Sequence, residues 1–333
     1  FQLMYGARSV RIGPRCSVNA TSSPRRGIVM AADGSQPKYA VACKLAIRAI
    51  RVAQRSELPI EVLHVGAAED FSAVDASTLG AMGGVTVADL LPRLAPPLRH
   101  AAASRLRSFA VKPFALLASS FEQVLLMDTN VLLFAPPEEL FGMAGYHATG
   151  AQLFQDYTPS FSTLDPWLTT SYVGGGGAAD AAAAYRRIAR GADVDSSSVV
   201  LDKARAWDYL HVVAALNWWR AAFYRHTWGD KDTWALAAVA LGRDAASSAG
   251  ARVGWMVDLR ERPPAAVWGH MQFRAAAAVG DVGDRLLYLN WQPHYEAGYF
   301  ELAPRGPAAE QLGCCVFLDE QWAGPHDRAT LLP

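Results

Sequence analysis

The segment Val111–Phe141, VKPFALLASSFEQVLLMDTNVLLFAPPEELF, decides the fold. Within it Val124–Met127 is a short apolar run, the pattern of a strand covered on both faces. Asp128 follows where this strand is expected to end, and Pro136–Glu138 then supply a helix start with early negative charge. Ligands bind beyond the carboxyl ends of strands in open α/β sheets, so a carboxylate there can hold a divalent cation against a diphosphate. The commoner role of a lone Asp is to cap the next turn.

Length and composition limit the number of domains and the classes of protein to which the chain can belong. The chain has 333 residues, 51% of them hydrophobic, which suffices for one large α/β domain with insertions or two smaller domains. A formal net charge of zero leaves no basic footprint for nucleic acid. No apolar run is long enough to span a bilayer; the nearest, His211–Tyr224, is interrupted by Asn217 and Arg220. The four cysteines lack metal-site spacing, and Cys43 is expected to be a buried free thiol.

The order of elements predicts a parallel sheet at the N-terminal end. A strand at residues 27–32, a helix from Pro37 to about Gln54 and a strand at residues 60–65 form a strand–helix–strand unit. The helix is expected to bury one face, formed by Val41, Leu45, Ala49 and Val52. Further strands are expected at residues 84–90, 148–154, 197–201, 255–259, 267–273 and 286–289, and helices at 105–119, 203–224 and 229–241. Gly174–Gly177 are expected to lie in an insertion.

The segment resembles the metal-binding strand of nucleotide-sugar glycosyltransferases of the GT-A type. It is most similar to the fungal-type α-mannosyltransferases of glycosyltransferase family 71, whose pattern runs K-P-x-A-L-L-x-S-S-F-E-x-V-L-L-L-D-x-D-N and then P-E-x-L-F. Arg26–Met30 and Leu58–Val62 also resemble segments of that family. The residues of the segment that follow the pattern are Lys112, Pro113, Ala115, Leu116, Leu117, Ser119, Ser120, Phe121, Glu122, Val124, Leu125, Leu126, Asp128, Glu138, Glu139, Leu140 and Phe141.

The resemblance implies an α/β fold of the GT-A type, with a mixed central sheet flanked by helices. It implies a stem at residues 1–24, a glycosyltransferase domain at 25–303 and a C-terminal extension at 304–333. The expected activity is retaining transfer of mannose from GDP-mannose to a glycan acceptor, assisted by Mn²⁺ or another divalent cation. The expected location is the Golgi lumen, as the luminal domain of a type II membrane protein whose anchor precedes residue 1. Two alternatives are a transferase that uses a UDP-sugar and a glycan- or nucleotide-binding module without catalysis.

The resemblance assigns Asp128 and Asn130 to the metal, and Lys112 to the donor site. The usual device is Asp-x-Asp, but this chain has Asp128-Thr129-Asn130, so the second ligand is an amide without charge. The family has a His, a plausible third ligand, where this chain has Tyr288. His270 or His294 could replace it, although a single His among aromatic residues is more often structural.

Two further motifs suggest residues that act on the sugar. Asp195 takes the place of a Glu in the family and could bond sugar hydroxyls. Gly229-Asp230-Lys231 matches the family closely; Asp230 is expected beside the transferring sugar and Lys231 at a phosphate. The competing role of Asp230 is an N-cap of the following helix. Lys203 is expected to be a solvated base after a helix-start acid.

Three more polar residues complete the predicted site. The resemblance places Asp156 and Asn290 at the substrate. Asp33 follows the first strand, where the base and ribose of the nucleotide are held in this fold. Asp33 and Asp156 could equally be turn residues.

Overall fold

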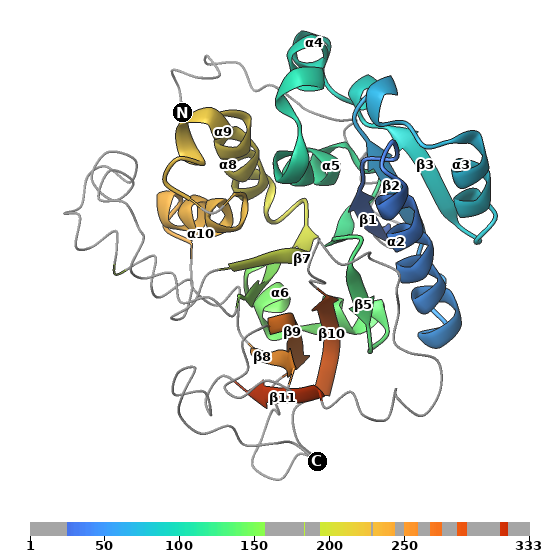
Figure 1. Ribbon diagram of the computed structural model, residues 1–333. Helices are drawn as coiled ribbons and strands as arrows, with labels where there is room; N and C mark the ends of the chain where they lie inside the picture. Colours follow the sequence, from blue (N-terminus) through green and yellow to red (C-terminus); the bar gives the residue numbers. More distant parts are fainter. Residues whose placement is uncertain are drawn as a thin grey trace.

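The computed structural model describes residues 25–156, 183, 194–227, 229–243, 250–258, 267–274, 285–291 and 314–318. The predicted stem and Gly174–Gly177 lie outside the described residues. The described chain forms two sheets with helices around the larger one (Figure 1). The predicted class, α/β with a mixed central sheet flanked by helices, is confirmed.

The central sheet explains why Asp128 is a good place for a ligand. Its strands are β1 (Arg26–Ala31), β2 (Ile60–His64), β3 (Val85–Asp89), β4 (Gln123–Met127), β6 (Ala151–Gln155) and β7 (Val194–Asp202). They lie in the order β3-β2-β1-β4-β7-β6. The first four are parallel, whereas β7 runs antiparallel to both β4 and β6. The carboxyl ends of β1 and β4 therefore lie at the same edge of the sheet, next to the N-terminal end of β7.

The second sheet is antiparallel and lies below the first in Figure 1. Its strands are β5 (Val131–Leu133), β8 (Ala251–Asp258), β9 (Val267–Arg274), β10 (Arg285–Trp291) and β11 (Cys314–Leu318), in the order β11-β8-β9-β10-β5. Strand β5 follows β4 after three residues, and its partner β10 carries Asn290 opposite Val131. This pairing brings a C-terminal residue to the end of β4.

Helices cover both faces of the central sheet. They are α2 (Pro37–Arg48), α3 (Ala73–Gly80), α4 (Pro96–Arg105), α5 (Lys112–Ala118), α6 (Ala144–Thr149), α8 (Trp207–Trp218), α9 (Arg220–Phe223) and α10 (Lys231–Ala240). A π-helical turn, Ala49–Ala53, continues α2, and 3-10 turns lie at Ala67–Glu69, Leu91–Arg93, Ser108–Val111 and Pro137–Gly142. Helices α5, α8 and α10 share one core with the sheet, and α2 and α6 share another.

Strand β4 belongs to both cores. Val124 and Leu126 pack with the first core, while Leu125 and Met127 pack with the second, and all four are fully buried. Alternate side chains of a strand point to opposite faces, so an uninterrupted apolar run fits a strand covered on both sides. The prediction for Val124–Met127 is confirmed, and Asp128 is the first residue after the strand.

The predicted buried face of α2 is wrong. Leu45 and Val52 are 44% and 66% exposed, whereas the buried residues of this helix are Ala40, Cys43, Ala46 and Ile47. The buried positions keep a helical spacing but lie on a neighbouring face of the helix, so the predicted face was displaced around the helix axis. Cys43 is a buried free thiol, as predicted, and burial raises its pKa to about 12.

The predicted helix 105–119 is broken in the structure. Helix α4 ends at Arg105, Leu106 leaves the helical region with φ −86° and ψ 78°, and α5 begins only at Lys112. Pro113 suits the first turn of α5 but would remove a hydrogen bond in the middle of a longer helix. Among the described residues, no helix is both long and apolar enough to cross a membrane.

Gly27 provides a test of the packing of β1. A Cβ on this residue would stand 2.4 Å from ring atoms of Phe121, so Gly27→Ala forces the ring to move. We expect the free energy of unfolding to fall by about 1–3 kcal/mol in urea titrations. The control is Gly80→Ala at the end of α3, where a Cβ meets nothing within 4 Å. Equal stability of the two variants would contradict this packing.

Candidate functional site

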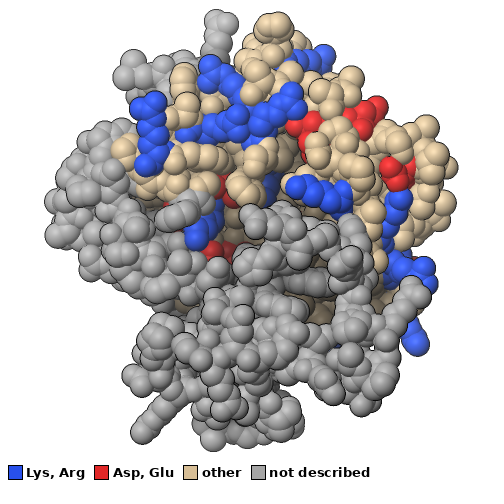
Figure 2. Space-filling view, in the orientation of Figure 1, with Lys and Arg blue, Asp and Glu red and all other residues tan. Residues whose placement is uncertain are grey.

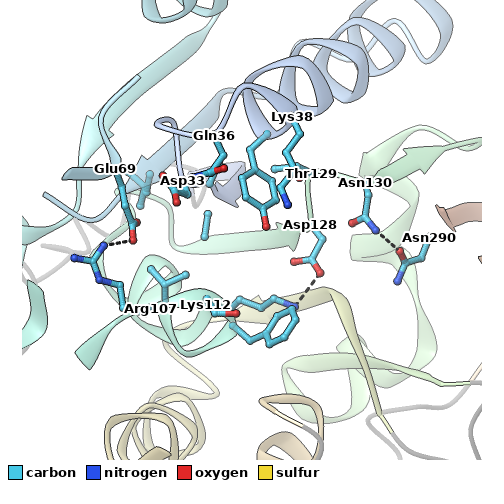
Figure 3. A pocket seen from close by; sticks show the side chains of 17 residues that line it. Asp33, Gln36, Lys38, Glu69, Arg107, Lys112, Asp128, Thr129, Asn130 and Asn290 are labelled. Carbon is cyan, nitrogen blue, oxygen red and sulfur yellow. Dashed lines mark hydrogen bonds and ion pairs between the residues drawn. The ribbon is translucent and has the colours of Figure 1, made fainter. Parts of the chain in front are cut away.

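A pocket of about 700 Å³ opens at the carboxyl ends of β1 and β4. Residues before α2, the 3-10 turn before α5 and the segment after β4 form its walls (Figure 3). This volume suits a ligand of the size of a sugar nucleotide. The lining residues are Ala31, Ala32, Asp33, Gln36, Lys38, Tyr39, Leu63, Glu69, Arg107, Ser108, Phe109, Val111, Lys112, Asp128, Thr129, Asn130 and Asn290.

Three pairs of polar side chains follow one another along the pocket. Figure 3 shows an ion pair at one end, a second ion pair in the middle and a pair of amides at the other end. Both ion pairs bring a cation to the wall, which suits an anionic ligand. The pairs are Arg107–Glu69 at 2.5 Å, Lys112–Asp128 at 2.9 Å and Asn130–Asn290 at 2.9 Å.

Lys112 is the centre of the site. It is 5% exposed, and its ammonium donates to Asp128 Oδ2 at 2.9 Å and to the backbone oxygen and hydroxyl of Ser196 at 3.0 and 3.2 Å. Oδ2 of Asp230 lies 3.7 Å from the same ammonium. The lysine thus joins α5, the end of β4, β7 and the start of α10. The structure brings Lys112 and Asp128 together in the pocket, and their assignments to the donor and the metal stay predictions.

The charges of this cluster shift one another's pKa. Burial lowers the pKa of Lys112, but Asp128, Asp230 and Asp195 outweigh it and hold that pKa above its ordinary value. Burial raises the pKa of Asp128 to about 6, although Lys112 opposes the shift. Burial also raises the pKa of Asp230, again against the effect of Lys112. Burial is therefore the main reason that the pKa of each of these two carboxyls is raised, and the neighbouring ammonium offsets it only in part.

Asp230 does not use its side chain as an N-cap. It stands at the N-cap position of α10, yet its carboxylate makes no capping hydrogen bond and is buried beside Lys112. Gly229 before it has φ of 77°, a conformation that favours glycine, and Phe109 packs against this glycine. The turn therefore directs Asp230 inward, and the competing cap role is wrong.

Asp195 lies behind the pocket wall. Its Oδ1 accepts from the amide of Ser197 at 2.8 Å, and its Oδ2 accepts from the hydroxyl of Tyr288 at 3.0 Å. Tyr288 is fully buried and packs edge-on against Phe154. The tyrosine in place of the expected histidine therefore orients Asp195 and does not line the pocket. Neither it nor Asp195 is among the lining residues.

The residues present do not fit a resident divalent cation. Asp128 is the only carboxylate of its triplet and is already paired with Lys112. The Asn130 amide donates to Oδ1 of Asn290, so two neutral side chains bond to each other where further ligands would be needed. Throughout the described ranges no three His, Cys, Asp or Glu residues are placed to share an ion. The predicted Mn²⁺ site at Asp128 and Asn130 is not confirmed.

The two histidines considered as third ligands lie where the structure describes no side chain. His270 lies in β9, where its backbone pairs with that of Asn290, and its side chain is not described. His294 lies outside the described residues. Asn290, predicted to contact substrate, lies in the pocket.

The other predicted residues divide into two groups. Asp33 lines the pocket and also accepts from the amide and hydroxyl of Ser35 at 3.1 and 2.6 Å, so it is a turn residue as well. Lys231 instead pairs with Asp156 at 3.1 Å, and neither belongs to the pocket lining. Their predicted contacts with phosphate and substrate stay predictions.

Sequence reasoning missed Arg107 and Glu69 and misplaced Lys203. Glu69 follows β2, so the strand-end rule that selected Asp33 and Asp128 could have found it. Arg107 depends on the break between α4 and α5, which was not predicted. Lys203 is buried and donates to the backbone oxygen and hydroxyl of Ser119, both at 2.8 Å; it is not a solvated base.

Residues 25–174 match the family model described as "Mannosyltransferase putative". A curated relative, "Putative alpha-1,3-mannosyltransferase MNN14" of Candida albicans, is 25% identical over 143 residues, 40% of this chain and 20% of the relative. The chain thus spans about a fifth of the length of that relative. The family match covers β1 to β6 and confirms the resemblance to mannosyltransferases over those residues.

Solved glycosyltransferases also resemble the chain. The mannosyltransferase Ktr4p from S. cerevisiae in complex with GDP has a TM-score of 0.44 at 13% identity, with 68% of each chain covered. Core-mannan synthase A from Aspergillus fumigatus, in a Mn/GDP form, has a TM-score of 0.38 at 10% identity, with 65% of this chain and 70% of that chain covered. Mouse xyloside xylosyltransferase 1 has a TM-score of 0.42 at 12% identity, with 64% and 81% covered.

The raised pKa of Asp128 gives a test of the cluster. The pKa of this carboxyl is raised from its ordinary value of 3.8 to about 6 in the folded protein. The folded state therefore binds the proton more tightly than the unfolded state, and the free energy of unfolding falls as the pH rises from about 3.8 to about 6. Asp128→Asn stays neutral, so it should be more stable than the wild type at pH 7.5, by about 1–2 kcal/mol once the partial exposure of the side chain is allowed for.

This gain should shrink towards zero at pH 4.5, as measured by urea unfolding at both pH values. Glu57→Gln, which removes an exposed carboxylate, is the control. A gain of the same size at both pH values would show that the effect does not come from the charge of Asp128.

Proposed function

We propose that this chain is a hexosyltransferase that moves mannose from GDP-mannose to a glycan acceptor. The carrying observation is the pocket at the ends of β1 and β4, with the Lys112–Asp128 pair in its wall. The pocket residues from Ala31 to Asn130 fall within the stretch that matches a mannosyltransferase family. Sugar-nucleotide transfer needs an anion site for a departing diphosphate at such a strand end.

The charge of the surface near the pocket supports an anionic donor. Figure 2 shows Lys and Arg side chains gathered on the upper part of this face, where α4 and α9 lie in Figure 1. Arg99 and Arg105 belong to α4, and Arg220 begins α9. Arg220 also donates to the backbone oxygen of Arg107 at 2.8 Å, which ties this basic region to the pocket wall. Such a field attracts a diphosphate and raises its local concentration.

The chemistry divides between the diphosphate and the sugar. The acceptor hydroxyl oxygen forms a bond to C1 of mannose, the bond between C1 and the diphosphate oxygen breaks, and the hydroxyl proton passes to the departing diphosphate. Lys112 and Arg107 face the negative charge that grows on the leaving group. Asp230 and Asp195 hold the cluster from behind the wall; the resemblance assigns both to sugar hydroxyls, although neither lines the pocket. Retention at C1 is the outcome that the family resemblance implies.

The expected Mn²⁺ cofactor has less support from the described residues than the sugar-nucleotide donor has. The described residues offer it one charged ligand, Asp128, and the neutral amides of Asn130 and Asn290. A location in the Golgi lumen, with an anchor before residue 1, stays a prediction from the resemblance.

Two donors and one non-enzymatic role can be separated in a single set of assays. Purified protein is given GDP-mannose or UDP-sugars with a mannose-containing acceptor, and both transfer and donor hydrolysis are measured. Mannose transfer from GDP-mannose supports the proposal, and transfer from a UDP-sugar alone contradicts the donor. Glycan binding without turnover of any donor would favour a binding module, the alternative that Asn130 suggests by weakening the metal site.

Asp230→Asn tests whether this buried carboxylate acts in turnover. Because Asp230 makes no capping hydrogen bond and its burial raises its pKa, we expect the variant to fold with at least wild-type stability. Turnover should fall about 100-fold or more, while the affinity for GDP changes little. Kinetics, calorimetry with GDP and thermal unfolding measure the three effects.

The matched control is Asp232→Asn, the same change two residues further along α10. Its carboxylate is also buried, but it is not placed at Lys112. Normal turnover in Asp230→Asn, or an equal loss in both variants, would rule out a specific role for Asp230.

A further inference from the structure

We propose that Lys112 serves as the resident cation for the diphosphate, so that the site binds its nucleotide without a divalent metal ion. This inference rests on the proposed function, because it assumes that the pocket holds a nucleoside diphosphate. It replaces the cation that the family resemblance implies with a side chain of this protein.

The ligand set at Asp128 is poor in charge. A hard divalent cation takes carboxylate, carbonyl and water oxygens, but the carboxylates supply the charge, so each lost carboxylate weakens the site. Here the pocket lining includes the amides of Asn130 and Asn290, and Nδ2 of Asn130 donates to Oδ1 of Asn290 at 2.9 Å. A cation would have to compete with that hydrogen bond and would gain no charge from either residue.

The position of Lys112 also suits a resident cation. Lys112 is buried on the protein side by Ser196 and Asp230, and it meets Asp128 on the pocket side. The side chain of Asp128 is 25% exposed, against 6% for Lys112. A phosphate oxygen that enters the pocket can therefore share or replace the bond to Asp128 while the other partners keep the ammonium in place. A cation fixed in advance needs no reorganisation when charge develops.

Electrostatic repulsion further disfavours a metal ion at Asp128. A metal ion bound to Asp128 would stand beside the ammonium, which already lies 2.9 Å from this carboxylate. Two positive centres around one carboxylate repel each other strongly in a partly buried site. The aromatic ring of Phe109, whose centroid lies 5.3 Å from the ammonium, further favours a lysine that stays charged at this position.

The test is calorimetric binding of GDP to the full chain at pH 7.5, once with EDTA and once with Mn²⁺. We expect the two dissociation constants to agree within about twofold. Binding that weakens about tenfold or more in EDTA would overturn the inference and leave the proposed function intact. Absence of GDP binding in both conditions would instead contradict the proposed function, so the two failures are distinguishable.

For Asp128→Asn, a site that uses Lys112 as its cation and a site that uses a metal ion predict opposite changes in GDP affinity. In EDTA, Asp128→Asn should bind GDP about threefold more tightly or better, because it removes a negative charge that faces the diphosphate. If Asp128 held a metal ion, the same variant would bind GDP more weakly in Mn²⁺ than the wild type does. This result would overturn the inference.

Lys112→Met should weaken GDP binding about tenfold or more in both conditions. Lys203→Met is the matched control, since Lys203 is also buried and bonded to a serine but lies outside the pocket. Circular dichroism checks that both variants fold. A folded Lys112→Met with wild-type affinity would overturn the inference, and the Asp128→Asn arm decides if Lys112→Met does not fold.

Discussion

The buried ammonium of Lys112 is the contact on which the site depends. It joins the first turn of α5 to Asp128 at the end of β4, to Ser196 in β7 and to Asp230 at the start of α10. Removing the ammonium itself costs about 3–5 kcal/mol, since the buried carboxylates around it lose their cation. The lysine thus fixes the relative positions of four segments that are distant in sequence. The same geometry places a positive charge in the pocket wall.

Local patterns predicted the part of the site that lies near β4. An uninterrupted apolar run predicts a strand that is buried on both faces, and the residue after such a strand is a candidate ligand position. Asp128 could therefore be predicted from the sequence alone. The contact of Asn130 with Asn290 could not, because it joins residues 160 positions apart through the pairing of β5 with β10. Arg107 was missed for another reason: its place depends on a break in a helix that apolar periodicity runs across.

A displaced helix face and buried charges account for the errors. Helix α2 packs through Ala40, Cys43, Ala46 and Ile47, while Leu45 points outward, because several apolar stripes compete along this helix. Lys203 and Asp230 looked like ordinary helix-start charges, yet both are buried with specific partners. In each case the burial of the side chain depends on which residues of another helix or strand pack against it, and the sequence of one helix does not contain that information. The family resemblance pointed to these positions, and the geometry shows what they contact.

The central proposal is that Lys112 meets the diphosphate at the end of β4. A crystal structure grown with both GDP and Mn²⁺, with diffraction recorded at the manganese edge, tests it most directly. We expect a diphosphate oxygen within hydrogen-bond distance of Lys112 and no anomalous peak between Asp128 and the nucleotide. A manganese peak coordinated by Asp128 and the diphosphate, with Lys112 turned away from the phosphates, would contradict it.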